Sequence, residues 1–437
     1  MAVFLWYNHP MGRKKKIRRN KKTTKRRIRI SRSFLIPFIL TLSLAVVTGL
    51  LILAACQWVL EPARQVQSVT KPVERPAPED ETADAPLQGE EADEEQDKYQ
   101  AELNDPEYMA QNNICYREAG EPGSATLLFA GDILFDDHYA IMKHLQSGGG
   151  IDQGIAPELI REMERADVMM LNNEFAYSDR GTPLEGKQFT FRARPETVSY
   201  LNDMGVDIVS LANNHAYDYG EEALLDTLDT LQEAGITAIG AGRNLSEARR
   251  PAYYIVDDLK IAFITATQIE RLDNTDTRGA TDVSAGVFRC WDGENLLETV
   301  REAKKNCDFV VVYVHWGTEN VDTLDWAQLK QAPEVIAAGA DLVIGDHPHC
   351  LQPIGVIQGV PVIYSLGNFW FNSKTLDTGM VKVVINQDGI VSYQFIPCLQ
   401  SDCRTVRLEG EEKKRVLDYM RSISEGVQID EEGYVTW

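Results

Sequence analysis

Side chains of the kinds that bind divalent metals follow five apolar segments of the 437-residue chain. Each segment reads as a buried strand and ends directly in carboxylate, amide or imidazole groups. The five motifs are FAGD (Asp132), MLNNE (Asn173, Glu174), SLANNH (Asn213, Asn214, His215), VYVHWG (His315) and VIGDHPH (Asp346, His347, His349). Because ligands of α/β folds bind where the carboxyl ends of strands meet, we expect one cluster. Its donors suit one or two divalent ions of the Zn, Mn or Fe type.

The histidines support a metal site. Four of the seven lie in these motifs, and although a single histidine is more often structural, four at strand ends favour ligation. His347 and His349 are two residues apart, so in an extended segment both face the same side and each can reach a different ion. Asp132 and Glu174 supply carboxylates, and the two oxygens of Glu174 could bridge two ions.

Asn214 and His215 are neighbours and therefore diverge. Asn214 can offer a neutral oxygen to a metal while His215 turns toward the substrate, where an imidazole is a suitable general acid. A metal ion in the cluster would activate water for attack on phosphorus or an acyl carbon. We therefore expect His215 to be the catalytic residue.

The segment FRARPE offers Arg192 and Arg194, which extend to the same side if the segment is strand-like. Guanidinium groups bind carboxylate or phosphate through paired hydrogen bonds, so both are candidates for substrate binding. Surface salt bridges are the alternative. Asn213 and Asn368 are further candidates for substrate binding, although Asn368, in YSLGNF, could instead only shape the edge of the site.

The elements that must position these groups alternate along the chain. Helical patterns follow the early strands, and Asp218 and Glu221 have the spacing of a capping box before one of them. Three hairpins are expected, with turns at Asp257-Asp258, Gln358-Gly359 and Asp388-Gly389. Strand-helix units first and hairpins last favour an α/β sandwich over one doubly wound sheet.

Charge divides the chain. The net charge is -22, yet residues 1–33 hold 13 basic residues and no acidic one, which leaves 31 basic against 66 acidic residues elsewhere. Residues 34–56 are apolar and long enough to span a bilayer. A basic segment before such a span predicts a cytoplasmic N-terminus, a single-pass signal anchor and an extracytoplasmic remainder. Cleavage before Cys56 with lipid attachment is the alternative, and the pattern does not favour nucleic-acid binding.

Three further regions follow the anchor. Residues 57–123 are acidic, rich in Pro and poor in large apolar residues, so they predict a disordered linker. Residues 124–400 should form the folded domain. Residues 401–437 read as a tail with one helix at about 410–423.

The motifs AGDILF, NNE, FRARPE, LANNHAYDYG, HWGTE, GADLVIGDHPHCLQPI and YSLGNF resemble the CapA family, linked to poly-γ-glutamate capsule synthesis, and more distantly the calcineurin-like metallophosphatases. The resemblance covers about residues 125–400 and implies a four-layer αββα sandwich. It implies one ion held by Asp132, Glu174 and His349, and a second held by Glu174, Asn214, His315 and His347, with His215 as the acid.

Two departures from the metallophosphatase pattern concern the first ion. That superfamily usually has a D-x-H motif at the first strand, whereas Asp132 is followed by Ile133 and Leu134. Asp136, Asp137 or His138 could compensate for the missing imidazole. The usual G-H-x-H motif also carries an inserted Asp346. A single-metal site is therefore an alternative to a two-metal site.

The expected function is that of a membrane-anchored, extracytoplasmic protein in poly-γ-glutamate synthesis, export or anchoring, with a metal-dependent hydrolase- or transferase-type site. The expected partners are the membrane, an anionic cell-envelope polymer or a phosphoester substrate, and subunits of a polymer synthase complex. A non-enzymatic surface subunit of an export complex and a surface phosphodiesterase unrelated to capsule are the alternatives.

Overall fold

The computed structural model describes residues 98–269 and 277–437. The predicted basic segment, the predicted span at 34–56 and most of the predicted linker lie outside these residues. Within the described ranges, no helix is both long and apolar enough to cross a membrane.

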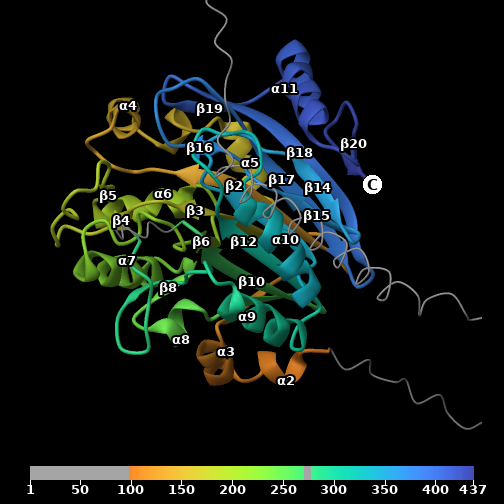
Figure 1. Cartoon of the computed structure of the whole chain (residues 1–437), viewed down its shortest axis with the longest axis horizontal. Coiled ribbons are helices and arrows are strands. Elements are labelled where there is room, and N and C mark those ends of the chain that lie inside the picture. Colours follow the sequence, from red (N-terminus) through yellow and green to blue (C-terminus); the bar gives the residue numbers. More distant parts are fainter. Residues whose placement is uncertain (1–97, 270–276) are drawn as a thin grey trace, which may run out of the picture. The chain divides into compact units, whose positions relative to one another are not determined.

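Two large β-sheets carry the predicted site (Figure 1). The eight-stranded sheet runs β19 (Arg404–Arg407), β18 (Gly389–Ser401), β17 (Leu376–Asn386), β2 (Ala125–Ile133), β3 (Val168–Asn173), β6 (Ile208–Ser210) and β7 (Thr237–Ile239), with β16 (Asn368–Trp370) also pairing with β2. The seven-stranded sheet runs β1 (Ile114–Arg117), β9 (Ala252–Val256), β10 (Leu259–Thr267), β12 (Phe309–His315), β13 (Leu342–Asp346), β15 (Val360–Ile363) and β14 (Ile354–Ile357).

The strands that carry the site pair in parallel with one another within each sheet. Strands β2, β3, β6 and β7 pair in parallel, as do β10, β12, β13 and β15. Antiparallel pairs extend both sheets: β17 pairs with β2 and β18, and β9 and β14 pair with β10 and β15. The three predicted hairpins are therefore present, although the third turn lies at Gln387-Asp388 and not at Asp388-Gly389, because Gly389 already pairs with Asn386.

Both sheets are buried on both faces, and alternate residues of a strand enter different cores. Leu127 and Phe129 of β2 pack in the core between the sheets, together with Val311 and Tyr313 of β12. Leu128, the neighbour of Leu127, packs in the outer core of its own sheet. The Tyr313 hydroxyl also donates to the Ala130 carbonyl, 2.8 Å away, which links the two sheets beside the site.

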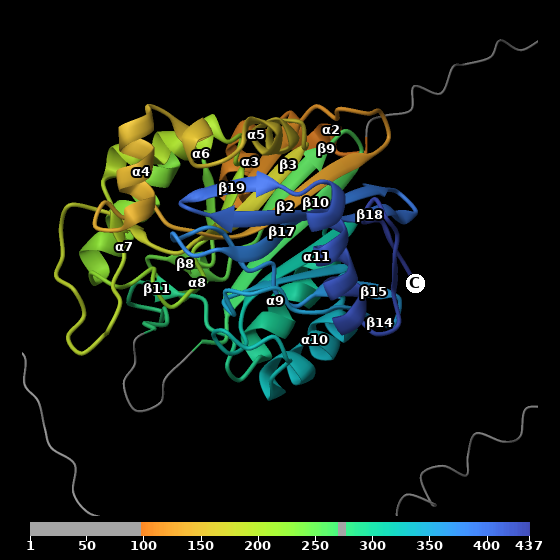
Figure 2. The ribbon, with the colours of Figure 1, turned by 90° about the horizontal axis from the view of Figure 1, so that it is seen from above.

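Helices cover the outer faces. Apolar residues of α4 (Ala140–Gly148), α5 (Pro157–Glu164), α6 (Ser199–Asp203) and α7 (Glu221–Glu233) join the outer core of the eight-stranded sheet. Those of α9 (Glu294–Lys304) and α10 (Trp326–Ala338) cover the seven-stranded sheet (Figure 2). The order helix, sheet, sheet, helix agrees with the predicted α/β sandwich.

The shorter elements connect these layers. They are η2 (Ile151–Gln153), η3 (Pro195–Val198), α8 (Leu245–Ala248), β4 (Ala176–Tyr177), β5 (Arg192–Ala193), β8 (Ala241–Gly242), β11 (Gly286–Val287), β20 (Gln428–Ile429) and β21 (Val435–Thr436).

The folded region starts before residue 124, which corrects the predicted linker boundary. Helices α2 (Gln100–Leu103) and α3 (Pro106–Asn112) precede β1, which pairs in parallel with β9. The Asp105 side chain caps α3 by accepting from the Tyr108 backbone N–H, and Ile114 is buried. The acidic composition of residues 57–123 as a whole gave no local indication of this short strand.

The predicted C-terminal tail also belongs to the domain. Strand β18 crosses residue 400, and β19 adds the edge strand of the eight-stranded sheet. Helix α11 (Gly410–Ile423) lies where the sequence predicted a helix, and its Val416, Leu417 and Met420 pack into the core between the sheets.

Candidate metal centre

The metal-type side chains meet where the carboxyl ends of the two sheets face each other. Asp132 lies in β2, and Glu174 directly follows β3. His315 ends β12 in the other sheet, and His347 follows β13. Sites of α/β proteins form at this edge of a sheet, and here two such edges contribute to one site.

An irregularity in β2 directs Asp132 into the site. The register between β2 and β3 shifts between Phe129 and Asp132, so the β2 strand has one extra residue there. Such bulges turn the side chain that follows them. Gly131 lies in the bulge, where an added Cβ would stand 1.9 Å from the Gly367 carbonyl oxygen. A glycine is therefore needed for this close approach of β2 and β16.

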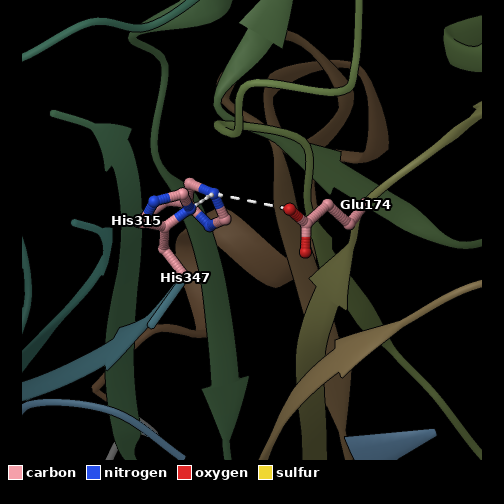
Figure 3. Close-up of side chains that lie close together, drawn as sticks. All are labelled: Glu174, His315 and His347. Atoms are coloured by element: carbon pink, nitrogen blue, oxygen red, sulfur yellow. Dashed lines mark hydrogen bonds and ion pairs between the residues drawn. The ribbon is translucent and has the colours of Figure 1, made fainter. Parts of the chain in front are cut away.

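One half of the cluster centres on His315. Its Nε2 lies 2.8 Å from the Asn214 Oδ1, 3.0 Å from the His347 Nδ1 and 3.7 Å from the Glu174 Oε1. Figure 3 shows Glu174, His315 and His347 pointing toward one another from both sheets. All four side chains are buried. Four donor atoms of three kinds thus face one small volume.

The other half centres on Asp132. Its Oδ2 lies 3.0 Å from the His349 Nδ1, which is also 2.8 Å from the Asn368 Oδ1. Its Oδ1 accepts a 2.8 Å hydrogen bond from the Asn172 amide. Donor atoms of Asp132, Glu174 and His349 all lie within 4.8 Å of one another, as do those of Glu174, His315 and His347. Glu174 therefore has donor atoms in both halves of the cluster.

The donor set fits a divalent cation. Ligand atoms around a tetrahedral ion with metal–ligand bonds of about 2.0–2.1 Å lie about 3.3 Å apart, close to the separations found here. The Glu174 Oε1 is buried with no hydrogen-bond partner, although buried polar atoms are nearly always paired. Imidazole, amide and carboxylate donors suit ions of the Zn, Mn or Fe type.

Burial sets the protonation of the His315 half. Burial lowers the pKa of His315 to about 3. It lowers the pKa of His347 well below its ordinary value, and the neighbouring His315 adds to this shift. Both imidazoles are therefore neutral near pH 7, which is the form that binds metals. Burial, Asp132 and Asp346 raise the pKa of Glu174, so ionisation of this carboxyl is unfavourable unless a cation binds beside it.

In the Asp132 half, hydrogen bonding and charge outweigh the effect of burial on the pKa values of Asp132 and His349. Burial opposes ionisation of Asp132, but the hydrogen bond and charge of His349 outweigh it and lower the Asp132 pKa. Burial likewise opposes protonation of His349, but Asp132 outweighs it and raises the His349 pKa. Each residue of this pair therefore favours the charged form of the other.

The loop that carries both imidazoles is strained. His347 has φ of 91° and His349 has φ of 55°, both in the left-handed region that non-glycine residues rarely adopt. Such strain persists where the surrounding structure enforces it and is concentrated at functional sites. The predicted extended conformation is therefore wrong, since both residues have positive φ. Each imidazole nevertheless contacts a different half of the cluster.

His215 is held beside Glu174 by a carboxylate that the sequence assigned elsewhere. Its Nδ1 lies 2.7 Å from the Asp218 Oδ2, and its Nε2 lies 3.8 Å from the Glu174 Oε1. The predicted capping box is wrong: Gly220 caps α7 without a side-chain hydrogen bond. Asp218 instead accepts from the Phe191 backbone N–H and pairs with Lys187.

The protonation of His215 depends on opposing groups. Burial lowers its pKa, and Asp218 only partly offsets this effect. The imidazole is therefore neutral at pH 7 in the metal-free protein. With Nδ1 facing Asp218, Nε2 is the ring nitrogen on the side of Glu174.

The predicted arginines lie away from the cluster. Arg194 pairs with Asp137 and Glu196 on the surface, the alternative that the sequence left open. The Arg192 guanidinium lies 4.5 Å from the centroid of the Tyr219 ring. Neither arginine contacts a cluster side chain in any interaction seen among the described residues.

The groups considered as substitutes for the missing imidazole also lie elsewhere. Asp136 accepts hydrogen bonds from the Arg192 and His138 backbone N–H groups, and Asp137 pairs with Arg194. The His138 side chain is exposed. The Asp132 half therefore has one imidazole, that of His349.

Three further buried residues complete the site, and none of them was named from the sequence as a candidate site residue. Asn172 contacts Asp132 and lies 3.5 Å from both Glu174 and His315. Asp346 lies 3.0 Å from the His315 Nδ1, behind the ring nitrogen that faces the cluster. Carboxylates in this position orient metal-binding imidazoles. The third residue is Asp218.

The predicted Asn213 is a support of the loop. Its amide donates to the Asn172 Oδ1, and its Oδ1 accepts from the backbone N–H groups of His215 and Ala216. Asn368 contacts His349 and thus lies at the edge of the cluster.

The family model described as "Bacterial capsule synthesis protein PGA_cap" matches residues 126–373. This range covers every member of the cluster, while β1, β17, β18 and β19 lie outside it. The chain belongs to this family, as its resemblance to CapA proteins indicated.

Curated relatives agree. The chain is 34% identical over 224 residues to the PGA biosynthesis protein CapA of Bacillus subtilis, covering 48% of this chain and 55% of that protein. It is 30% identical over 285 residues to the capsule biosynthesis protein CapA of Bacillus anthracis, covering 62% and 66%. The alignments thus span about half to two thirds of these relatives.

Solved structures are more distant. A 5'-nucleotidase from Candida albicans has 10% sequence identity and a TM-score of 0.33, over 65% of this chain and 52% of that one. The protein TT1561 of Thermus thermophilus has the same identity and TM-score, over 60% and 99%.

Proposed function

We propose that this chain is a membrane-anchored, extracytoplasmic protein of poly-γ-glutamate capsule synthesis, export or anchoring, with a metal-dependent hydrolase- or transferase-type site. Membership of a capsule synthesis family and the two CapA relatives support the capsule role. The apolar span at 34–56, with basic residues before it, supports the anchor and the orientation.

One observation carries the metal-dependent part of the proposal. Asn214, His315 and His347 surround the buried Glu174, whose Oε1 has no hydrogen-bond partner. A buried carboxylate oxygen beside neutral imidazoles is unfavourable unless a cation binds there. These four residues would hold one divalent ion, and Asp132 and His349 with Glu174 would hold a second.

The chain's own residues define the chemistry. When bound, the ion supplies Lewis acidity toward a carbonyl or phosphoryl oxygen. His215 exchanges a proton with the substrate through Nε2, and Asp218 fixes the tautomer through Nδ1. Asp346 orients His315 in the same way. A site that combines these groups is suited to hydrolysing an ester or amide bond, or to transferring the group released from it to an acceptor.

The test uses the purified full-length chain in detergent with a panel of γ-glutamyl amides and phosphodiesters. We expect turnover of a γ-glutamyl substrate, and a fall of at least about 100-fold in His215→Ala, since general acid–base catalysis contributes 10²–10⁴-fold. Metal content should be unchanged in this variant. Metal-loaded wild type that turns over none of the panel contradicts the enzymatic proposal.

Complementation in cells distinguishes the enzymatic capsule role from the two alternative functions. In a capsule-forming host that lacks its own copy, the wild type should restore polymer and His215→Ala should not. Full restoration by His215→Ala would support the non-enzymatic export subunit. Turnover of phosphodiesters alone, without any effect on polymer, would support the unrelated phosphodiesterase.

A further inference from the structure

A cleft of about 500 Å³ opens onto the candidate metal centre. Asn214, His215 and His347 line it together with residues of the surrounding loops. Its other walls include the aromatic side chains of Phe189, Trp291 and Trp326. A molecule in this cleft is therefore next to the reacting groups.

Aromatic side chains line the cleft and remain accessible. Trp326 is 55% exposed and Phe189 is 52% exposed, although large apolar side chains are usually buried. Trp291 and Trp326 meet edge to face, with ring centroids 5.5 Å apart. Trp326 begins α10, where the Asp325 side chain forms a capping box and fixes the start of the helix. The indole thus projects from a rigid position.

The polar groups of the cleft are mainly uncharged or acidic. Among its described lining residues, Lys187 is the cation, and its ammonium is already bonded to Asp218 and to the Asn214 carbonyl. Glu319 and Asp325 add negative charge at the rim. Gln188 and Gln268 offer amide donors and acceptors. A polyanion would meet no cluster of cations here, apart from an ion bound at the metal centre.

We infer that this cleft binds an uncharged sugar ring of a cell-envelope glycan, stacked on Trp326 and Trp291. The apolar C–H face of a pyranose fits an exposed indole, and its hydroxyl groups pair with amides and carboxylates. The inference rests on the proposed function, because it names the acceptor of the proposed transfer: the sugar would bind in the cleft, while the γ-glutamyl group would be bound through the metal centre beside it. A glycan beside His215 also suits a protein that anchors polymer to the envelope.

Calorimetric titration of the full-length chain in detergent tests the inference. The probes are the β-1,4-linked tetramer of N-acetylglucosamine and γ-linked tetraglutamate. Wild type should bind the sugar tetramer in preference to tetraglutamate. Trp326→Ala should weaken sugar binding at least tenfold, and Trp326→Phe, which keeps a ring, should weaken it less.

Trp437→Ala is the matched control, since Trp437 is also exposed but packs against Tyr393 outside the cleft. It should bind the sugar like wild type. Wild type that fails to bind the sugar, prefers tetraglutamate, or binds equally well as Trp326→Ala overturns the inference. Metal content is measured on the same samples. Wild type that retains metal but does not bind the sugar contradicts the sugar-binding inference alone. Wild type that contains no metal contradicts the proposed metal-dependent function.

Discussion

The buried Asp218 carboxylate pairs with the Lys187 ammonium and also contacts the His215 imidazole. The Lys187 and Asp218 side chains are 7% and 0% exposed. Removing one partner of a buried ion pair leaves the other charge uncompensated, which costs about 3–5 kcal/mol. Asp218→Asn should therefore lower the free energy of unfolding by roughly this amount, measured by urea denaturation.

Arg194→Gln is the contrasting variant. Its partners are Asp137 and Glu196, and all three side chains are partly solvent-exposed. Surface pairs contribute about 0–1 kcal/mol, so the urea midpoint should barely change. Equal losses in the two variants would contradict a special role of the buried pair.

At the residue scale, the sequence identified groups that directly follow strands. His315 and Glu174 could be predicted because the apolar run and the ligand are contiguous. Asn172 was hidden because it precedes Glu174 in the same motif and reads as part of the strand. Asp218 was misassigned, since its spacing to Glu221 is equally that of a helix cap. Only the folded structure shows that Asp218 pairs with Lys187 and contacts His215.

At the scale of elements, the bulge in β2 decides where Asp132 points. Gly131→Ala would place a methyl group 1.9 Å from the Gly367 carbonyl oxygen. The backbones of β2 and β16 must then separate, and Asp132 moves with them. We expect a loss of about 1–3 kcal/mol in stability and weaker metal binding, measured by urea denaturation and metal titration.

Gly355→Ala controls for glycine substitution in a strand. An added Cβ there would lie 3.5 Å from the Tyr364 ring, an ordinary contact. Stability and metal affinity should stay close to wild type. Unchanged metal affinity in Gly131→Ala would show that the bulge does not position Asp132.

Element types were more predictable than special geometry. The Asp257-Asp258 and Gln358-Gly359 turns follow from local residue preferences, and Asp257 and Gln358 indeed have positive φ. The bulge in β2 and the positive φ of His347 and His349 arise from contacts between distant segments. No local pattern encodes them.

At the scale of the whole molecule, two sheets from different parts of the chain complete one centre. The sequence predicted the sandwich because strand-helix units and hairpins are locally encoded. It misplaced the domain boundaries because β1 and β19 are short edge strands, whose stability comes from pairing with β9 and β18. The acidic or mixed composition around them gave no local signal.

A metal that joins the two sheets should stabilise the whole domain. A ligand present at 100 times its dissociation constant stabilises by about 2.7 kcal/mol. Chelation of the full-length chain should therefore lower Tm by several degrees, since 1 kcal/mol corresponds to about 2–4 °C even in a 150–250-residue domain. Readdition of Zn²⁺ or Mn²⁺ should restore it, and an unchanged Tm would argue against a structural link through metal.

The most direct measurement is the metal content of the purified full-length chain by mass spectrometry, in wild type, His347→Ala and His138→Ala. The His138 side chain is exposed and lies outside the cluster, so it is the matched control. We predict at least one equivalent of a transition metal in wild type and His138→Ala, and in His347→Ala the loss of the ion held by Glu174, Asn214, His315 and His347. Wild type without metal above background, or His347→Ala with undiminished metal, would contradict the metal centre proposed for this fold.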